Sequence, residues 1–392
     1  MRSGLADIID NLPAVEKKIH HMSDVLLANL VMVSEIPAPT FGEENRMRFL
    51  VNRFTESDLI NCSTDEAGNA LGILPGRKGE RNILLAAHMD TLFDHRIDHT
   101  VYIQDNRVTG PGIGDNSLGV AALATLPACL DYLNIHLDSN LILMGSSKSL
   151  GEGNVEGANF FLNHAEVPIN FGICIEGMKL GRLSYSSIGM MMCVITLEVP
   201  EEYDWTRFGA VGSIVTLHEV MDRILKIPLP RKPKSSIILG SVEGGKGFNK
   251  IATKAILRFE VRSESDDIVK DIEQKIQDIV DEVAARSGMR IQMHMVSRRK
   301  PGGIKISHPL ARAGRAIISK LGMQPLVYAT TSPLSAFFQH EVPAVAMGIT
   351  TGERRMERDE STEAVKIDPM FTGLAQLAAM LLAMDTQTDS RR

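Results

Sequence analysis

Hydrophobic residues recur along the chain at two spacings, and the alternation between them predicts an α/β fold. Helical spacing predicts two helices between Leu5 and Ile36 and a third over Glu43–Phe54. Short apolar runs then alternate with helical stretches, a pattern typical of a mainly parallel sheet flanked by helices. We expect strands within 67–76, 82–90, 140–147 and 171–177, and helices over 118–133 and 154–164.

The middle of the chain follows a different order. Strands are expected at 190–199, 235–241, 252–263 and 290–297, with helices at 209–226 and 266–287. This β-α-β-β-α-β order predicts a ferredoxin-like unit. The α/β pattern resumes after it with a helix at 310–321, a strand at 343–349 and a helix at 370–383. We therefore expect an α/β domain made of residues 1–187 and 299–392, with residues 188–298 inserted as a second domain.

Composition narrows the class of protein. The 392 residues are 44% hydrophobic and carry a formal net charge of −6, which is typical of a soluble globular protein. Mild acidity argues against a nucleic acid or an anionic membrane as partner. We see no run of about 20 apolar residues and no amino-terminal signal-peptide pattern. Four widely spaced cysteines are expected to be buried, reduced thiols, so we expect a cytoplasmic protein.

Polar residues follow several of the predicted parallel strands, where chemistry collects in such sheets. His88 and Asp90 end one strand, Ser147 and Lys148 end another, and Glu176 ends a third. An Asp two residues after a His shares its face and can orient the ring of a metal ligand. Taken alone, such a pair at a strand end more often has a purely structural role.

Asp115 lies in a glycine-rich turn that opens a predicted helix. Its carboxylate can serve as a metal ligand, even a bridging one, or as an ordinary helix N-cap. The spacing alone favours the N-cap.

Several motifs then follow one another in a characteristic order. They are IPAPTFGEENR (36–46), HMDT (88–91), GPGIGDNSLGVAAL (110–123), GGKGFNKIATKAILRFEVRS (244–263) and VPAVAMGIT (342–350). With the inserted unit, this order resembles the two-zinc peptidases and amidohydrolases that include peptidase T, carboxypeptidase G, aminoacylase and acetylornithine deacetylase. The resemblance extends from about Val33 to Lys366. It implies a metal-binding domain interrupted by a lid that often forms a dimer interface.

The resemblance also implies a set of site residues. His88 matches the first metal ligand, Asp90 its orienting partner, Asp115 a carboxylate that bridges two metals, and Glu176 the ligand that completes the first site. Arg262 and Asn249 match residues of the lid that contact substrate. The implied cofactor is zinc, and the implied ligand is a small peptide or an acyl-amino-acid-like molecule.

The sequence departs from the family pattern where the second metal should bind. A Glu-Glu pair, comprising the general base and a ligand, is expected where Ser147 and Lys148 stand. A histidine ligand is expected at Asp359, and no histidine follows His340. An ammonium group and a divalent cation repel each other strongly at short range. We therefore expect Lys148 to replace the second cation and to pair with Asp115 and Asp359.

These departures favour a protein that has kept the fold and lost two-zinc hydrolysis. Loss of a general base typically costs about two to four orders of magnitude in rate. Such a protein would be a binding or regulatory homologue with at most one zinc, forming a homodimer through the lid. The alternative is a single-zinc peptidase or N-acyl amino acid amidohydrolase that uses His88, Asp115 and Glu176. A nucleotide- or sugar-binding module has no motif in its favour, because GPGIG lacks the Lys and Ser/Thr of a phosphate loop.

Overall fold

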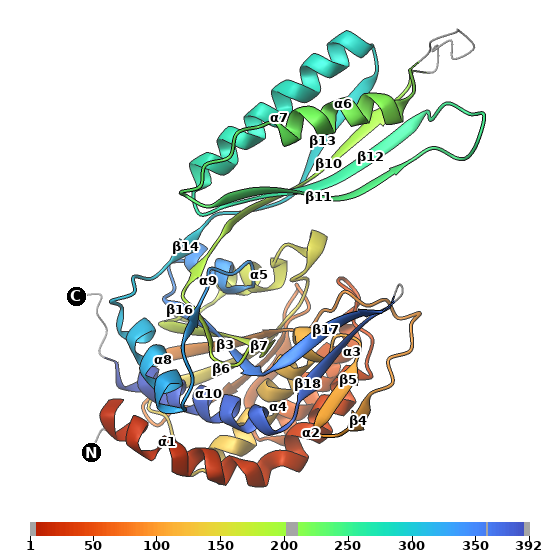
Figure 1. The fold of residues 1–392 in the computed structure, drawn as a ribbon. Helices are drawn as coiled ribbons and strands as arrows, with labels where there is room; N and C mark the ends of the chain where they lie inside the picture. The colour runs from red at the N-terminus through yellow and green to blue at the C-terminus, as the bar shows by residue number, and fades with distance from the viewer. Residues whose placement is uncertain (1–4, 201–210, 358–359, 388–392) are drawn as a thin grey trace. The chain divides into compact units, whose positions relative to one another are not determined.

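The structure is a computed structural model that describes residues 5–200, 211–357 and 360–387 (Figure 1). The chain divides into two compact units, which we call unit 1 (1–186 and 303–392) and unit 2 (187–302). The sequence predicts the two junctions after residues 187 and 298, and the structure has them after residues 186 and 302.

Unit 1 is built on an eight-stranded sheet whose central strands are parallel. The pairs β6–β3, β3–β7 and β7–β16 are parallel, whereas β1–β2, β2–β6 and β16–β8 are antiparallel. The expected mainly parallel sheet flanked by helices is therefore confirmed. The strand order is β1 (Ile60–Thr64), β2 (Ala70–Leu74), β6 (Asn140–Ser146), β3 (Asn82–His88), β7 (Phe171–Met178), β16 (Ala344–Thr350), β8 (Arg182–Ser184) and β15 (Leu326–Val327).

Helices cover both faces of this sheet, which explains why β3 is apolar throughout. All seven residues of β3 are buried: Ile83 and Leu85 belong to one core cluster, Leu84 and Ala86 to another. A strand buried on both faces lacks polar alternation. The first cluster includes residues of α1 (Leu5–Ile19), α2 (Ser23–Ser34), α3 (Glu44–Glu56), α4 (Leu118–Tyr132), α8 (Pro309–Lys320) and α10 (Asp368–Thr386), and the second residues of α5 (Glu156–His164) and α9 (Leu334–Gln339).

One helical segment corrects the expectation that the chain has no apolar stretch long enough to span a membrane. Ile113–Tyr132, which comprises the short turn η2 (Ile113–Ser117) and α4, is long and apolar enough to cross a membrane by length and composition. Most of this segment is buried inside unit 1. Packing in the core therefore accounts for its apolar composition.

A second, four-stranded sheet of unit 1 was not predicted. Its neighbouring strands pair antiparallel, and it joins the carboxyl-terminal part of the chain to the segment before η2. In this ladder Glu363 lies opposite Arg354 on one side and Gly110 on the other. The order is β17 (Gly352–Glu357), β18 (Glu360–Lys366), β5 (Arg107–Gly110) and β4 (Tyr102–Gln104); the remaining short elements are η1 (His20–Met22), η3 (Gly151–Gly153) and the paired strands β9 (Ser186–Ser187) and β14 (Gly302–Gly303).

Unit 2 has the β-α-β-β-α-β order that the sequence predicts. Its four strands form an antiparallel sheet in the order β11-β12-β10-β13, and Figure 1 shows α6 and α7 together on one face of it. Apolar residues of both helices and of the inward-facing strand positions form a separate core. The elements are β10 (Gly189–Glu198), α6 (Ser213–Leu225), β11 (Ser235–Gly244), β12 (Lys254–Ser263), α7 (Asp266–Ser287) and β13 (Arg290–Arg299).

Candidate metal centre

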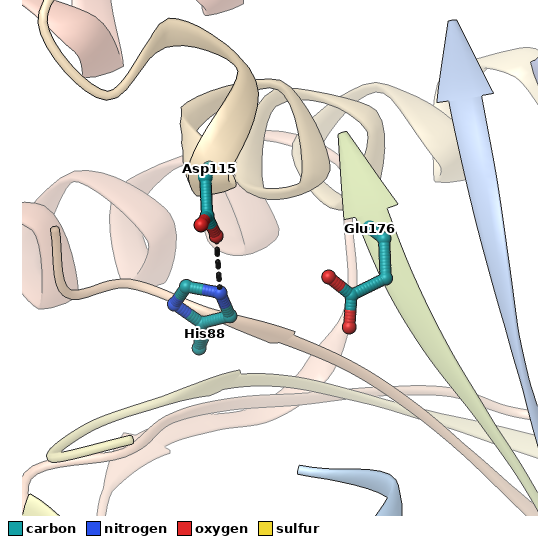
Figure 2. A group of neighbouring side chains, drawn as sticks. All are labelled: His88, Asp115 and Glu176. Carbon is teal, nitrogen blue, oxygen red and sulfur yellow. Dashed lines mark hydrogen bonds and ion pairs between the residues drawn. The ribbon is translucent and has the colours of Figure 1, made fainter. Parts of the chain in front are cut away.

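Three side chains expected at the first metal site lie together at one edge of the large sheet. His88 is the last residue of β3, Glu176 lies near the end of the parallel strand β7, and Asp115 lies in η2. One ligand atom from each residue lies within 4.8 Å of the others. Figure 2 shows the carboxylates of Asp115 and Glu176 directed toward the imidazole of His88. The proximity of His88 and Glu176 follows from topology, because carboxyl ends of parallel strands meet at one edge, and η2 adds Asp115.

Carboxylates contact both ring nitrogens of His88, which is 3% exposed. Nε2 lies 3.2 Å from Asp115 Oδ1. Nδ1 lies 3.3 Å from Asp90 Oδ1 and 3.0 Å from the Asp90 carbonyl oxygen. This arrangement fixes the ring plane and leaves Nε2 on the side of Asp115 and Glu176, which is the geometry an orienting carboxylate provides for a metal-binding histidine.

Asp90 is itself held by the loop that follows β6. Its Oδ2 accepts hydrogen bonds from the backbone N–H groups of Ser149 and Leu150, at 2.9 and 2.7 Å. The hydroxyl of Thr40 donates a third bond to the same oxygen at 2.9 Å. The loop in which the family places its Glu-Glu pair thus positions Asp90 through its backbone.

Asn116 ties the turn that carries Asp115 to the strand that carries Glu176. Its side-chain amide donates to the carbonyl of Ile175 at 2.9 Å and accepts from the N–H of Gly177 at 2.8 Å. A Cβ on Gly177 would lie 2.2 Å from the carbonyl oxygen of the residue before Asp115. Glycine at position 177 therefore allows the close approach that brings the two carboxylates together.

Burial and mutual contacts shift the pKa values of all three residues. Burial opposes ionisation of Asp115, yet contacts with His88 and Arg354 lower its pKa to about 2. Burial also opposes protonation of His88, but Asp115 and Asp90 hold its pKa well above the usual value. Burial, together with the charge of Asp115, raises the pKa of Glu176. Two carboxylates around one imidazole give the site the charge and donor atoms that a divalent cation requires.

One metal ion fits this donor set. Glu176 Oε1 is buried and accepts no hydrogen bond from the described residues, so it is an oxygen in need of a partner. His88, Asp115 and Glu176 would supply one nitrogen and two carboxylate oxygens, which suits zinc with an open fourth position. A zinc ion bound there would act as a Lewis acid toward a water or carbonyl oxygen.

The second metal site differs from what the sequence predicted. The ammonium of Lys148 pairs with Glu156 Oε1 at 2.7 Å, so the expected pairing with Asp115 is wrong. Glu156 begins α5 eight residues further on and provides a partly exposed carboxylate close to the loop. The Ser147 hydroxyl donates to the carbonyl of Ala67 at 2.7 Å. Asp359 lies outside the described residues.

Arg354, which the sequence did not single out, takes the place expected for Lys148 beside the Asp115 carboxylate. Its Nη2 lies 2.9 Å from Asp115 Oδ2 and 2.7 Å from Glu363 Oε1, and its Nε donates to the same Glu363 oxygen at 2.8 Å. Glu363 Oε2 accepts the N–H groups of Gly114 and Asp115, both at 2.9 Å. No strand is expected from the sequence between 352 and 366, and the antiparallel register of β17 and β18 brings Arg354 opposite Glu363.

Two further predicted site residues belong to unit 2. Arg262 donates through Nε and Nη2 to both carboxylate oxygens of Glu260, at 2.5 and 2.9 Å, so its charge already has a partner. Asn249 is exposed in the connection between β11 and β12, beside a cavity of about 700 Å³ that Lys246, Lys250 and Lys254 also line. Contact of either residue with substrate stays a prediction.

Comparisons with known proteins agree with this fold. The chain is 25% identical over 316 residues to the acetylornithine deacetylase of Vibrio parahaemolyticus, covering 76% of this chain and 81% of that protein. Two solved structures share the fold. A tripeptidase from Staphylococcus aureus has a TM-score of 0.75 at 17% identity, covering 93% of this chain and 99% of its own. A dinuclear metal-binding peptidase from Bacillus subtilis has a TM-score of 0.63 at 13% identity, covering 93% and 98%.

The family assignment rests on a match over most of the chain. Residues 84–383, which include His88, Asp115, Glu176 and all of unit 2, match the family model described as peptidase family M20/M25/M40. The chain belongs to this family of peptidases.

Proposed function

We propose that this protein has lost two-zinc hydrolysis and acts as a binding or regulatory homologue of the family's enzymes. One observation carries the proposal. At the two positions where the family has its Glu-Glu pair, the Ser147 hydroxyl is bonded to a backbone carbonyl and the Lys148 ammonium to Glu156. Neither side chain supplies a carboxylate that could accept a proton from a metal-bound water.

The energetic consequence is large enough to separate this protein from an active enzyme. A missing general base lowers the rate by about two to four orders of magnitude. A missing second metal removes charge stabilisation that is worth several kcal/mol in the transition state. Both losses fall on the same chemical step, so we expect turnover far below that of a two-zinc relative.

The ligand class follows from the relatives and from the first site. The matched relatives are described as a deacetylase of an acylated amino acid and as peptidases. A zinc ion at His88, Asp115 and Glu176 would bind an amide or carboxylate oxygen of such a molecule. We therefore propose that a small peptide or an acyl-amino-acid-like molecule binds here, with at most one zinc.

Zinc analysis combined with a hydrolysis panel tests the proposed function. Purified protein should hold at most one zinc per chain, with kcat/KM for di- and tripeptides and N-acyl amino acids at least about 10⁴-fold below that of an active relative assayed in parallel. The His88→Ala variant is the control for adventitious activity. Metal-dependent hydrolysis at an enzyme-like rate that disappears in His88→Ala would refute the proposal.

The single-zinc hydrolase is the second candidate, and Glu176 favours it. Its buried Oε1 lacks a hydrogen-bond donor among the described residues, as an oxygen kept for a metal would. On this alternative, wild-type protein holds close to one zinc and turns over substrate, and Glu176→Gln loses both zinc and turnover. Protein purified without zinc, and unable to take it up on dialysis, rules this alternative out.

We also propose a homodimer formed through unit 2. Strands β11 and β13 are the edges of its sheet, and an unpaired edge can add a strand from a second copy. Sedimentation equilibrium of the full chain tests this directly. A monomer at micromolar concentration would contradict it.

We place the protein in the cytoplasm on the basis of its thiols. All four cysteines are free, and burial raises the pKa values of Cys129 and Cys193 to about 12. Such thiols are suited to a reducing compartment. Fractionation of the native cell checks the location, and recovery outside the cytoplasm would overturn it.

A further inference from the structure

We propose that the guanidinium of Arg354 occupies the role of the second metal ion of this family and thereby closes the second metal site. The inference deepens the proposed function, because it identifies what has replaced the lost cation. Asp115, which the family resemblance assigns as the bridging carboxylate, has Oδ1 3.2 Å from His88 Nε2 and Oδ2 2.9 Å from Arg354 Nη2. One oxygen thus faces the first site and the other faces a fixed positive charge.

The backbone fixes Arg354 in this position. Arg354 and Glu363 are directly opposite each other in the β17–β18 ladder, so their side chains share a face of the hairpin. Glu363 is fully buried, and its second oxygen is bonded to the N–H groups of Gly114 and Asp115. The guanidinium therefore lies against the carboxylates of Asp115 and Glu363. Glu363 is in turn hydrogen-bonded to the backbone of the turn that carries Asp115.

The charges explain why a cation is needed there. Asp115 and Glu363 approach the same guanidinium nitrogen, at 2.9 and 2.7 Å, and two carboxylates so close together require a positive partner. An arginine supplies that charge at every physiological pH and matches carboxylates through several N–H donors. A divalent ion at Asp115 Oδ2 would meet this guanidinium at short range and be repelled.

An ordinary surface ion pair on the same sheet offers a matched comparison. Arg107 of β5 pairs with Glu353 of β17, and both side chains are nearly half exposed. Glu353 is exposed, whereas the Glu363 partner of Arg354 is fully buried. The Arg107→Ala variant therefore removes an arginine from this sheet without leaving a buried carboxylate unpaired.

Metal binding and thermal unfolding of the full-length protein test the proposal. Wild type, Arg354→Ala, Arg354→Gln and Arg107→Ala are dialysed against a fixed free zinc concentration, and zinc per chain is measured by mass spectrometry. Unfolding temperatures are recorded with a chelator and with zinc. The glutamine variant keeps a side chain of similar polarity without the charge, in case the alanine variant folds poorly.

We expect the two Arg354 variants to unfold about 5 °C or more below wild type in chelator, since a buried carboxylate has lost its cation. Zinc should raise their unfolding temperatures by more than it raises that of wild type, and they should hold up to one additional zinc per chain. The Arg107→Ala variant should match wild type in both measurements. Folding of an Arg354 variant only in the presence of zinc would equally support the proposal.

Three results would overturn it. The first is that folded Arg354 variants gain no zinc and no extra zinc-dependent stability. The second is that wild type already holds two zinc ions per chain, and the third is that both variants stay unfolded even with zinc. None of these measurements involves hydrolysis. Two zinc ions in wild type would also contradict the zinc count that the functional proposal expects. The other two results leave that proposal standing, because it is refuted by metal-dependent turnover of the wild-type protein.

Discussion

Asp90 connects the metal-binding residues to the loop that carries Ser147 and Lys148. It contacts His88 through one carboxylate oxygen and the backbone of that loop through the other. The family resemblance predicts the group of His88, Asp115 and Glu176, and the meeting of parallel strand ends at one edge accounts for His88 and Glu176. The sequence does not predict Arg354, because no local pattern indicates which residues a hairpin distant in sequence will contact. It predicts a wrong partner for Lys148, since Glu156 becomes its neighbour only through the path of the loop.

At the residue scale, the Asp90→Asn variant should weaken zinc binding about 10- to 100-fold, the usual effect of losing an orienting carboxylate. The amide removes the negative charge beside His88 Nδ1. Competition with a chromophoric chelator measures the change.

The Thr40→Val variant is the control for Asp90→Asn. It deletes one hydrogen bond to Asp90 but keeps the carboxylate, so its zinc affinity should fall by less. Unchanged affinity in a folded Asp90→Asn protein would show that Asp90 does not orient His88.

At the scale of elements, predictions succeeded where local signals mark both ends. α7 spans the predicted residues Asp266–Ser287, because apolar residues recur on one face and Gly288, with φ of 69°, ends the helix. The hairpin of β17 and β18 was missed, because its stability depends on pairing with β5, far away in sequence. A charged hairpin that pairs with a strand far away in sequence carries little local sequence signal.

The N-cap of α8 should make stability depend on pH. His308 Nδ1 accepts the N–H of Leu310 at 3.2 Å, which only the unprotonated nitrogen can do. Burial lowers the pKa of His308 in the folded state. The cap therefore stabilises fully above the unfolded value near 6.5, and this contribution is lost as pH falls below it toward the folded pKa.

We accordingly expect His308→Ala to cost about 1 kcal/mol at pH 8, a typical N-cap contribution, and clearly less at pH 5. Urea unfolding at both pH values measures the difference. The His136→Ala variant, at an exposed position, controls for general histidine titration. An equal cost at the two pH values would argue against the cap.

At the scale of the whole molecule, the order of elements was enough to predict both folds. The two units share no apolar cluster: unit 1 has two, and the core of unit 2 consists of residues from 191 to 291 alone. Because that unit is continuous in sequence, its β-α-β-β-α-β order is visible without knowledge of the rest. The site of unit 1 is harder to predict, because it combines residues from 88 to 363.

Separate cores predict two unfolding transitions in calorimetry. Zinc at 100 times its dissociation constant should stabilise only unit 1, by about 2.7 kcal/mol. The Phe259→Ala variant, buried in unit 2, should lower the other transition by about 3–5 kcal/mol. Phe54→Ala, buried in unit 1, should lower the zinc-sensitive transition instead. A single transition that responds to zinc and to both variants would contradict this assignment.

The position of Arg354 opposite Glu363 has a consequence for how such a protein changes over generations. A single side chain on the β17–β18 hairpin places the guanidinium against both carboxylates. The reverse path needs a carboxylate pair in the loop after β6, a metal-binding residue beyond His340 and the removal of Arg354. Removal of Arg354 alone leaves the buried Glu363 carboxylate without its cation, so the arginine-containing site resists a return to two-metal binding.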